Sequence, residues 1–147
     1  RPVLEAFSSN LVHVGTQPGQ GQAVKAINQL LVGVHMCATA EAFTLARKCG
    51  LDLQKMYDTI CTCAGRSEIF RNRGQYLIDR NFDTRSTLQI QLKDTGIVCK
   101  TADVVGAHTP MANLAKEMFK LAVNKYPPTD DSLEVVRLYE EMSNVEL

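Results

Sequence analysis

The sequence predicts an all-α fold, a multi-helix bundle built around one long buried helix at about residues 22–49. Three observations favour this fold. Apolar residues recur at helical spacing along most of the chain, helix-starting and helix-ending residues divide it into segments, and only residues 11–14 have the pattern of a strand. At 147 residues and 45% hydrophobic content, the chain is large enough to form a substantial core.

The N-terminal residues precede the bundle. Residues 1–9 are expected to form a helical end. The next segment, Leu11 to Val14, is short and apolar and is closed by Gly15, which predicts a strand. No second strand is evident in the sequence, so this strand is expected to remain unpaired or to pair with a second copy of itself.

The long helix is expected from about Gln22 to Cys49, because Gly50 is a favoured residue just past a helix end. Between Lys25 and Arg47 the only charged side chain is Glu41. Apolar side chains recur there at helical spacing, namely Ile27, Leu30, Leu31, Val34, Ala38, Ala42 and Leu45. We therefore expect this helix to be buried on most sides.

Capping residues and breakers place the other helices. Asp52 and Ser67 are expected to cap two helices, and Pro110 to open a later one that Pro127-Pro128 ends. The expected boundaries are a second helix from Asp52 to about Gly65, a third after Ser67, a loop at 80–84, a fourth helix from about Thr87 to Val105, a fifth from Pro110, and a last helix from Leu133 to Met142 capped by Asp131 or Ser132.

Composition excludes several classes of function. The 16 basic and 16 acidic residues cancel, and like charges form no run, so nothing supports binding to nucleic acid or to a membrane surface. The apolar stretch 30–40 contains His35 and Thr39 and is shorter than the roughly 20 residues that a membrane span needs. Because the chain begins without methionine, we expect a fragment of a longer protein. A cytoplasmic location fits best, with an organelle left open.

The cysteines and histidines do not predict a metal site. The five cysteines are odd in number and mostly lie at apolar helical positions, which favours reduced thiols. Cys61-Thr62-Cys63 lacks the two-residue spacer of redox and zinc motifs. The three histidines are scattered along the chain. We therefore expect them to be structural.

A polar triad lies at the start of the long helix. Lys25, Asn28 and Gln29 are three and four residues apart, so they are expected to share one helix face. A lysine surrounded by apolar neighbours loses solvation, which disfavours its charged form and suits it to general acid/base catalysis. The alternative is an ordinary first-turn lysine that extends to water beside two solvated amides.

Several motifs together resemble one enzyme family in their order along the chain. The motifs are Leu11-Val12-His13-Val14-Gly15, Gly19-x-Gly21, Lys25-x-x-Asn28-Gln29, Glu41-Ala42, Gly50-Leu51-Asp52, Ala64-Gly65-Arg66-Ser67, Asn81-Phe82, Leu92-Lys93-Asp94 and Thr109-Pro110-Met111. They resemble the C-terminal half of the β-hydroxyacid dehydrogenases, which include 3-hydroxyisobutyrate dehydrogenase, tartronate semialdehyde reductase and L-threonate dehydrogenase, with 6-phosphogluconate dehydrogenase more distant. The resemblance covers nearly the whole chain.

The resemblance implies an NAD- or NADP-dependent oxidoreductase that acts on a small hydroxy acid. It implies that Lys25 is the catalytic lysine, which moves the proton of the substrate hydroxyl while hydride passes to or from nicotinamide. It implies that Asn28 holds substrate oxygens and helps to place the lysine. Gln29 stands where several members carry asparagine, so its contact with substrate is a weaker expectation.

Three further residues receive expectations from the same resemblance. Lys93 matches a lysine that reaches toward the bound cofactor, although by itself it would suggest an exposed lysine paired with a neighbouring acid. Arg66 and Ser67 are expected either to contact the substrate carboxylate or, in the case of Ser67, simply to cap a helix.

The dinucleotide fingerprint needs a strand before it, a third spaced glycine and an acidic residue about 20 positions later, and Gly19-x-Gly21 is too weak a match. The sequence shows no full fingerprint and no alternation of strands and helices. We therefore expect residues 1–15 to be the remnant of a Rossmann domain outside this chain, and 16–147 to be a helical catalytic and dimerisation domain. The fragment alone is expected to be inactive, and the family implies homo-oligomers. The competing hypothesis is a non-catalytic scaffold or dimerisation module within a larger protein.

Overall fold

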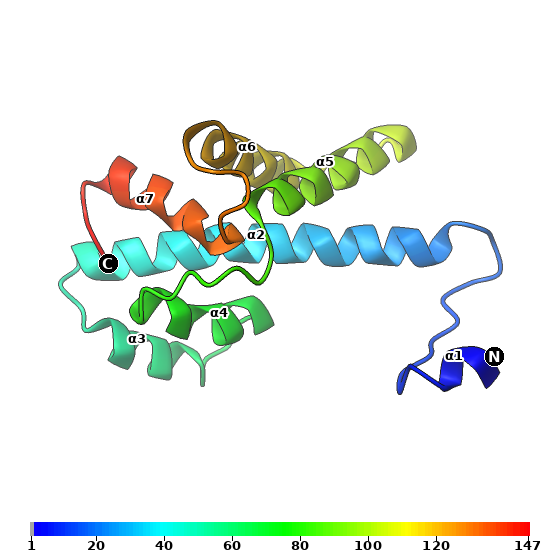
Figure 1. The fold of residues 1–147 in the computed structure, drawn as a ribbon, viewed down its shortest axis with the longest axis horizontal. Coiled ribbons are helices and arrows are strands. Elements are labelled where there is room, and N and C mark those ends of the chain that lie inside the picture. Colours follow the sequence, from blue (N-terminus) through cyan, green and yellow to red (C-terminus); the bar gives the residue numbers. More distant parts are fainter. Residues whose placement is uncertain (1) are drawn as a thin grey trace.

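The computed structural model describes residues 2–147, and over this range it contains helices and no strand (Figure 1). The expected all-α fold class is confirmed. The elements are α1 (Pro2–Glu5), α2 (Gln20–Lys48), α3 (Leu53–Ile60), α4 (Glu68–Ile78), α5 (Leu88–Val105), α6 (Pro110–Lys125), and a 3-10 turn (Ser132–Val135) that leads directly into α7 (Val136–Ser143).

Helix α2 is the spine of the bundle. Figure 1 shows α5, α6 and α7 on one side of it and α3 and α4 on the other, and α2 contacts all five. At 29 residues and 1.5 Å per residue, α2 is about 43 Å long. The first turns of α2 extend past the rest of the bundle, and the N-terminal segment with α1 lies apart from it.

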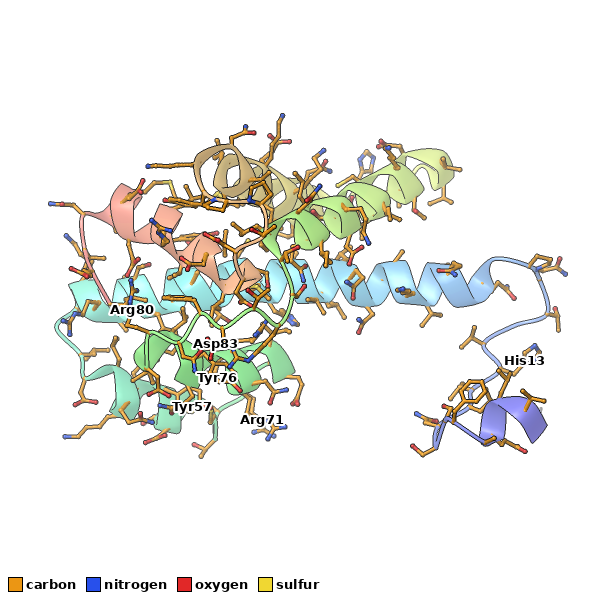
Figure 2. The ribbon with its side chains drawn as sticks, in the orientation of Figure 1. His13, Tyr57, Arg71, Tyr76, Arg80 and Asp83 are labelled. Carbon is orange, nitrogen blue, oxygen red and sulfur yellow. The ribbon has the colours of Figure 1, made fainter. Side chains whose placement is uncertain are left out.

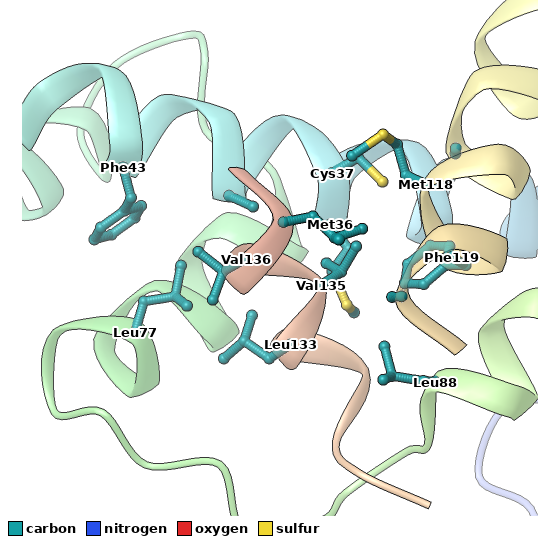
Figure 3. Close-up of a cluster of buried hydrophobic side chains, with 14 of the residues drawn as sticks. Met36, Cys37, Phe43, Leu77, Leu88, Met118, Phe119, Leu133, Val135 and Val136 are labelled. Atoms are coloured by element: carbon teal, nitrogen blue, oxygen red, sulfur yellow. The ribbon is translucent and has the colours of Figure 1, made fainter. Parts of the chain in front are cut away.

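The hydrophobic core surrounds the second half of α2. Met36 and Phe43 from α2 are fully buried, together with Leu77 of α4, Phe119 of α6 and Leu133 of the 3-10 turn (Figure 3). Three separate elements therefore meet on this half of α2. Burial of each such side chain contributes about 1.5–3 kcal/mol, which fixes the bundle here, whereas the first half of α2 packs only through Ala26 and Leu30 against a smaller cluster on α5 and α6.

Side-chain caps set the helix starts that the sequence predicted. Asp52 accepts a hydrogen bond from the backbone N–H of Lys55 at 2.9 Å, and Ser67 accepts one from the N–H of Phe70 at 3.0 Å. Asp131 accepts from the N–H of Leu133 at 2.9 Å. The helix that Asp131 caps starts as a 3-10 turn before it becomes α7, a break that the sequence analysis did not predict.

The expected strand at residues 11–14 is not formed. Its backbone makes no ladder with any described residue, and Leu11, Val12 and Val14 are exposed. A strand exists only through pairing with a neighbour, and the described residues offer none. Of the expected helical end at 1–9, only Pro2–Glu5 is helical, and Arg1 lies outside the described residues.

The expectation that α2 is buried on most sides is wrong for its first half. Val24, Ile27 and Leu31 are 49%, 60% and 47% exposed, because only α5 and the start of α6 cover this part of α2. By length and hydropathy α2 is the one helix of the described chain that could cross a membrane, although core helices of soluble proteins pass the same test. Its second half is the centre of the core.

Candidate functional site

A groove between α2 and α5 collects three of the residues that the sequence analysis singled out. Lys25 and Gln29 project into it from α2, and Lys93 projects from α5. The groove has a volume of about 360 Å³ and begins at Gly19, whose left-handed backbone (φ 90°) starts α2. Lys25 and Gln29 share this groove because residues four apart lie on one helix face.

Two hydrogen bonds and one ion pair join four polar side chains at this groove into one network. The Gln29 Nε2 amide donates to Asp94 Oδ2 at 2.6 Å, which links α2 to α5 across 65 residues of sequence. Lys93 Nζ lies 2.9 Å from the other oxygen of Asp94. At the opposite end, Asn28 Nδ2 donates to Gln29 Oε1 at 3.0 Å. The order of the network is therefore Lys93, Asp94, Gln29, Asn28.

Asp94 is the residue of this network that the sequence analysis did not list as a site residue. Its side chain is only 12% exposed, whereas that of Lys93 is 61% exposed. In the motif Leu92-Lys93-Asp94, the family resemblance implies a role for Lys93 and none for Asp94. The signal that pointed to Asp94 was its position one residue from Lys93, on the side of α5 that faces α2.

Lys25 does not meet the expectation of a buried lysine. The described residues leave it exposed at the groove, on the half of α2 that protrudes from the core. The chain by itself therefore does not desolvate the ammonium group. Any desolvation of Lys25 has to come from surfaces outside the described residues.

Asn28 opens toward a different groove from Lys25 and Gln29. This second groove has a volume of about 930 Å³ and runs along α2 toward α3 and the α3–α4 connection. Arg66 and Ser67 line it together with Asn28. The expected triad is thus divided: Lys25 and Gln29 face α5, Asn28 faces α4, and the Asn28–Gln29 hydrogen bond lies where the two grooves adjoin.

The second groove has mostly apolar walls and a polar end. Leu31, Ala38, Met56 and Ile60 are among its lining residues, whereas Asn28, Arg66 and Ser67 supply the amide, guanidinium and hydroxyl groups. Arg66 is exposed. Ser67 is the N-cap of α4, so its hydroxyl already accepts one hydrogen bond, from Phe70 N–H. A hydroxyl can still donate its own proton.

The groups whose pKa values the fold raises most lie outside both grooves. Burial raises the pKa of the Cys37 thiol from 9.0 to about 11, against a smaller opposing effect of its hydrogen bond with Tyr139. Burial, followed by the hydrogen bond to Glu141, raises the pKa of Tyr126 to about 12. Within the described residues, no group of three or more His, Cys, Asp and Glu side chains is arranged to hold a metal ion.

The side chains that crowd the α3–α4 end have mutual partners. Figure 2 shows Tyr57, Arg71 and Tyr76 in this region, and Tyr57 donates a hydrogen bond to the Arg71 carbonyl at 2.6 Å. His13 is on the N-terminal segment, away from the bundle (Figure 2). The Tyr57–Arg71 hydrogen bond stabilises the bundle locally, and neither residue lines either of the two grooves.

Comparison of the sequence and fold with known proteins identifies the family of this chain. An L-threonate dehydrogenase of Escherichia coli is 38% identical over 138 residues, which cover 94% of this chain and 46% of that protein. The crystal structure of a 3-hydroxyisobutyrate dehydrogenase from Salmonella typhimurium superimposes with a TM-score of 0.88 at 40% identity, over 93% of this chain and 48% of that one. A Mycobacterium tuberculosis 3-hydroxyisobutyrate dehydrogenase, solved with L-serine, gives 0.84 at 27% identity, over 95% and 50%.

The chain spans about half the length of the relatives that it matches. Residues 19–139 match the family model described as the NAD-binding domain of NADP-dependent 3-hydroxyisobutyrate dehydrogenase. That range starts at the glycine that opens α2 and ends within α7, so it includes both grooves. The chain therefore belongs to this family of NAD(P)-binding domains of 3-hydroxyisobutyrate dehydrogenases.

Proposed function

We propose that this chain is the helical half of an NAD(P)-dependent dehydrogenase that interconverts a small 3-hydroxy acid and its semialdehyde or keto acid. The observation that carries the proposal is the groove between α2 and α5, where Lys25, Gln29 and Lys93 come together from segments more than 60 residues apart. An exposed lysine, an oriented amide and a second cation at one groove suit an oxygen-rich anionic substrate beside a cofactor.

Lys25 is the proposed general acid/base. In the oxidation direction its neutral amine accepts the hydroxyl proton of the substrate, and in the reduction direction its ammonium returns that proton to the forming alkoxide. General acid/base catalysis of this kind contributes typically 10²–10⁴-fold. When bound, nicotinamide supplies hydride acceptance and donation. The exposed position of Lys25 leaves its ammonium accessible to a substrate that enters the groove.

Lys93 is the proposed cofactor contact. Its side chain is 61% exposed and pairs with Asp94 through one carboxylate oxygen only, so the ammonium retains donors for a phosphate or ribose oxygen. The described residues lack a phosphate-binding glycine loop after a strand. Lys93 would therefore add to contacts that the rest of the protein provides.

Asn28, Arg66 and Ser67 are the proposed substrate contacts on the second groove. Guanidinium and hydroxyl groups are suitable donors for a carboxylate, and the amide of Asn28 lies between them and the Lys25 side of α2. The apolar wall of the groove would accommodate the carbon substituent of the acid. Gln29 then acts on substrate through Asn28.

Residues 1–15 are the proposed end of a preceding dinucleotide-binding domain, and 16–147 the helical domain. Support comes from the unpaired segment 11–14 and from Val24, Ile27 and Leu31, which together expose an apolar face beside Lys25. Contact with that domain would remove water from Lys25. A second copy of the helical domain is the proposed partner for other exposed apolar surface, and a cytoplasmic location is proposed for the enzyme.

The test is turnover of the complete parent polypeptide with NAD and with NADP on a panel of small 3-hydroxy acids. We expect Lys25→Ala to lower kcat/KM by roughly 10² or more. Lys48→Ala, an exposed lysine at the other end of α2, is the matched control and should retain activity. A folded parent that is inactive on the whole panel would favour the alternative, a dehydrogenase-like scaffold or dimerisation module.

A further inference from the structure

In the network at the α2–α5 groove, the charge of Asp94 decides which groups donate hydrogen bonds and which accept them. Asp94 accepts a hydrogen bond from Gln29 Nε2 at 2.6 Å through one carboxylate oxygen, and its other oxygen forms an ion pair with Lys93 Nζ at 2.9 Å. A carboxylate in this state has no proton to donate. The group that faces Asp94 from α2 must therefore be a donor.

This requirement fixes the orientation of two amides. An amide side chain has an NH₂ end and a carbonyl end of similar shape, so its hydrogen-bond partners decide which end points where. Because the NH₂ group of Gln29 must face Asp94, its carbonyl oxygen faces Asn28 and accepts from Asn28 Nδ2 at 3.0 Å. Asn28 therefore uses its NH₂ group on Gln29, which leaves its carbonyl oxygen without a part in this hydrogen bond, and the residue lines the larger groove.

We propose that Asp94 is a positioning residue whose charge sets the polarity of the Gln29–Asn28 amide pair, so that Asn28 Oδ1 is presented to the substrate as a hydrogen-bond acceptor. The inferred ligand is a hydroxyl group of the substrate other than the reacting one, because the single proton of the reacting hydroxyl passes to Lys25. A methyl group or hydrogen atom at the same place cannot donate to Asn28 Oδ1. The site therefore selects hydroxy acids that carry a second hydroxyl group at this contact.

Reversal of the network would be unfavourable at its charged end. With both amides turned, Gln29 Oε1 would face the Asp94 carboxylate, and a charge-assisted hydrogen bond would be replaced by a contact between two acceptors. The side chain of Asp94 is only 12% exposed, so little water is available to separate them. The inference about substrate rests on the proposed function, whereas the inference about amide polarity does not.

The first experiment uses Asp94→Asn in the parent enzyme, with Asp103→Asn on the same helix as the exposed control. The amide that replaces the carboxylate can donate or accept, so both orientations of Gln29 become possible. We expect the KM for a hydroxy acid with this second hydroxyl group to rise roughly tenfold, with a smaller change in kcat and no increase in the KM for a hydroxy acid that lacks it. Equal effects of Asp94→Asn and Asp103→Asn, or equal rises for both substrates, would overturn the proposal.

A rescue variant separates polarity from simple loss of packing. In the double variant Asp94→Asn/Gln29→Glu, the carboxylate on α2 becomes the acceptor. The carboxylate at position 29 accepts hydrogen bonds from the NH₂ group of Asn28 and from the NH₂ group of the new amide on α5. Asn28 Oδ1 therefore again points away from position 29. We expect the KM of this double variant to return close to that of the unsubstituted enzyme. Gln29→Glu alone places two carboxylates opposite each other, so its KM should stay raised. A double variant no better than either single variant would count against the proposed polarity.

A measurement without turnover tests the network directly. In the 147-residue chain, the side-chain NH₂ protons of Gln29 and Asn28 should exchange slowly with solvent in NMR spectra, and Asp94→Ala should accelerate exchange at both. Asp103→Asn should leave both unchanged. Unprotected Gln29 protons in the unsubstituted chain would refute the polarity whether or not the parent is a dehydrogenase. Protected protons in an inactive parent would retain the polarity and refute only the proposed function.

Discussion

Thr95 of α5 occupies the space that a side chain on Gly33 of α2 would need: a Cβ atom built on Gly33 would lie 2.7 Å from the Thr95 methyl carbon. Thr95 is fully buried, and its hydroxyl donates to the Gln91 carbonyl at 2.8 Å, which holds the methyl group toward α2. Gln29 lies one turn before Gly33, and Asp94 is next to Thr95. The close approach of the two helices therefore brings Gln29 and Asp94 within hydrogen-bonding distance.

Gly33→Ala should destabilise the chain by about 1–3 kcal/mol, because the added methyl group overpacks the α2–α5 contact. Thr95→Ser removes the opposing methyl carbon and keeps the hydroxyl, so the double variant should recover much of that loss. Gly96→Ala is the control on α5, where a Cβ would meet nothing within 4 Å. Urea denaturation measures the free energies of unfolding, and simple additivity of Gly33→Ala and Thr95→Ser would contradict the proposed clash.

Ser67 has a structural role that can be separated from the proposed role in substrate binding. Ser67→Ala should cost about 1 kcal/mol of stability through loss of the N-cap of α4. Ser67→Asp retains a capping oxygen, so stability should be kept, but its negative charge should raise the KM for an anionic substrate in the parent enzyme. Asp52→Ala removes a comparable cap from α3 and should leave the KM unchanged. An unchanged KM in Ser67→Asp would exclude Ser67 as a carboxylate contact.

The 147-residue chain alone should show negligible affinity for NAD(H) or NADP(H) by calorimetry, since Lys93 is the one proposed cofactor contact within it. In the parent enzyme, Lys93→Ala should weaken cofactor binding, and Lys55→Ala, at an exposed position on α3, should not. Tight binding of cofactor by the isolated chain would show that the helical domain holds more of the cofactor site than we propose.

Stability should fall at alkaline pH in part through Cys37. Its pKa is about 11 in the folded chain, against 9.0 for an ordinary thiol, so the unfolded chain loses this proton first as pH rises. The contribution is complete below pH 9 and is lost between pH 9 and about 11. Cys37→Ala should flatten the pH dependence of unfolding in that window, whereas Cys49→Ala, at an exposed position, should not. Identical slopes for both variants would be evidence against this assignment.

Local signals in the sequence were sufficient for most helix boundaries. Asp52, Ser67 and Asp131 act as predicted caps, and Pro110 opens α6, because these residues determine the conformation of their own neighbours. Burial depends instead on what lies opposite a residue. The periodicity of α2 identified apolar positions but contained no information about which of them α4 to α7 would cover, so the first half of α2 was wrongly expected to be buried.

The candidate site was predictable to a similar extent. Helical spacing correctly placed Lys25 and Gln29 together, and resemblance to a family supplied Lys93, which the structure brings to the same groove. The direction of Asn28 and the contact between Gln29 and Asp94 depend on how α2 crosses α5. That crossing depends on Gly33 and Thr95, whose proximity no local pattern in the sequence reveals. The catalytic role of Lys25 stays a prediction.

The two halves of α2 have different tolerances for substitution. The buried residues from Gly33 onward, such as Met36 and Phe43, are held by the core, so changes to them alter whether the chain folds, whereas Lys25 and Asn28 are exposed on the first half and contribute little to stability. Mutations at the protruding half can therefore accumulate without crossing the stability threshold. The groove residues on the first half of α2 can therefore change while the bundle itself stays folded.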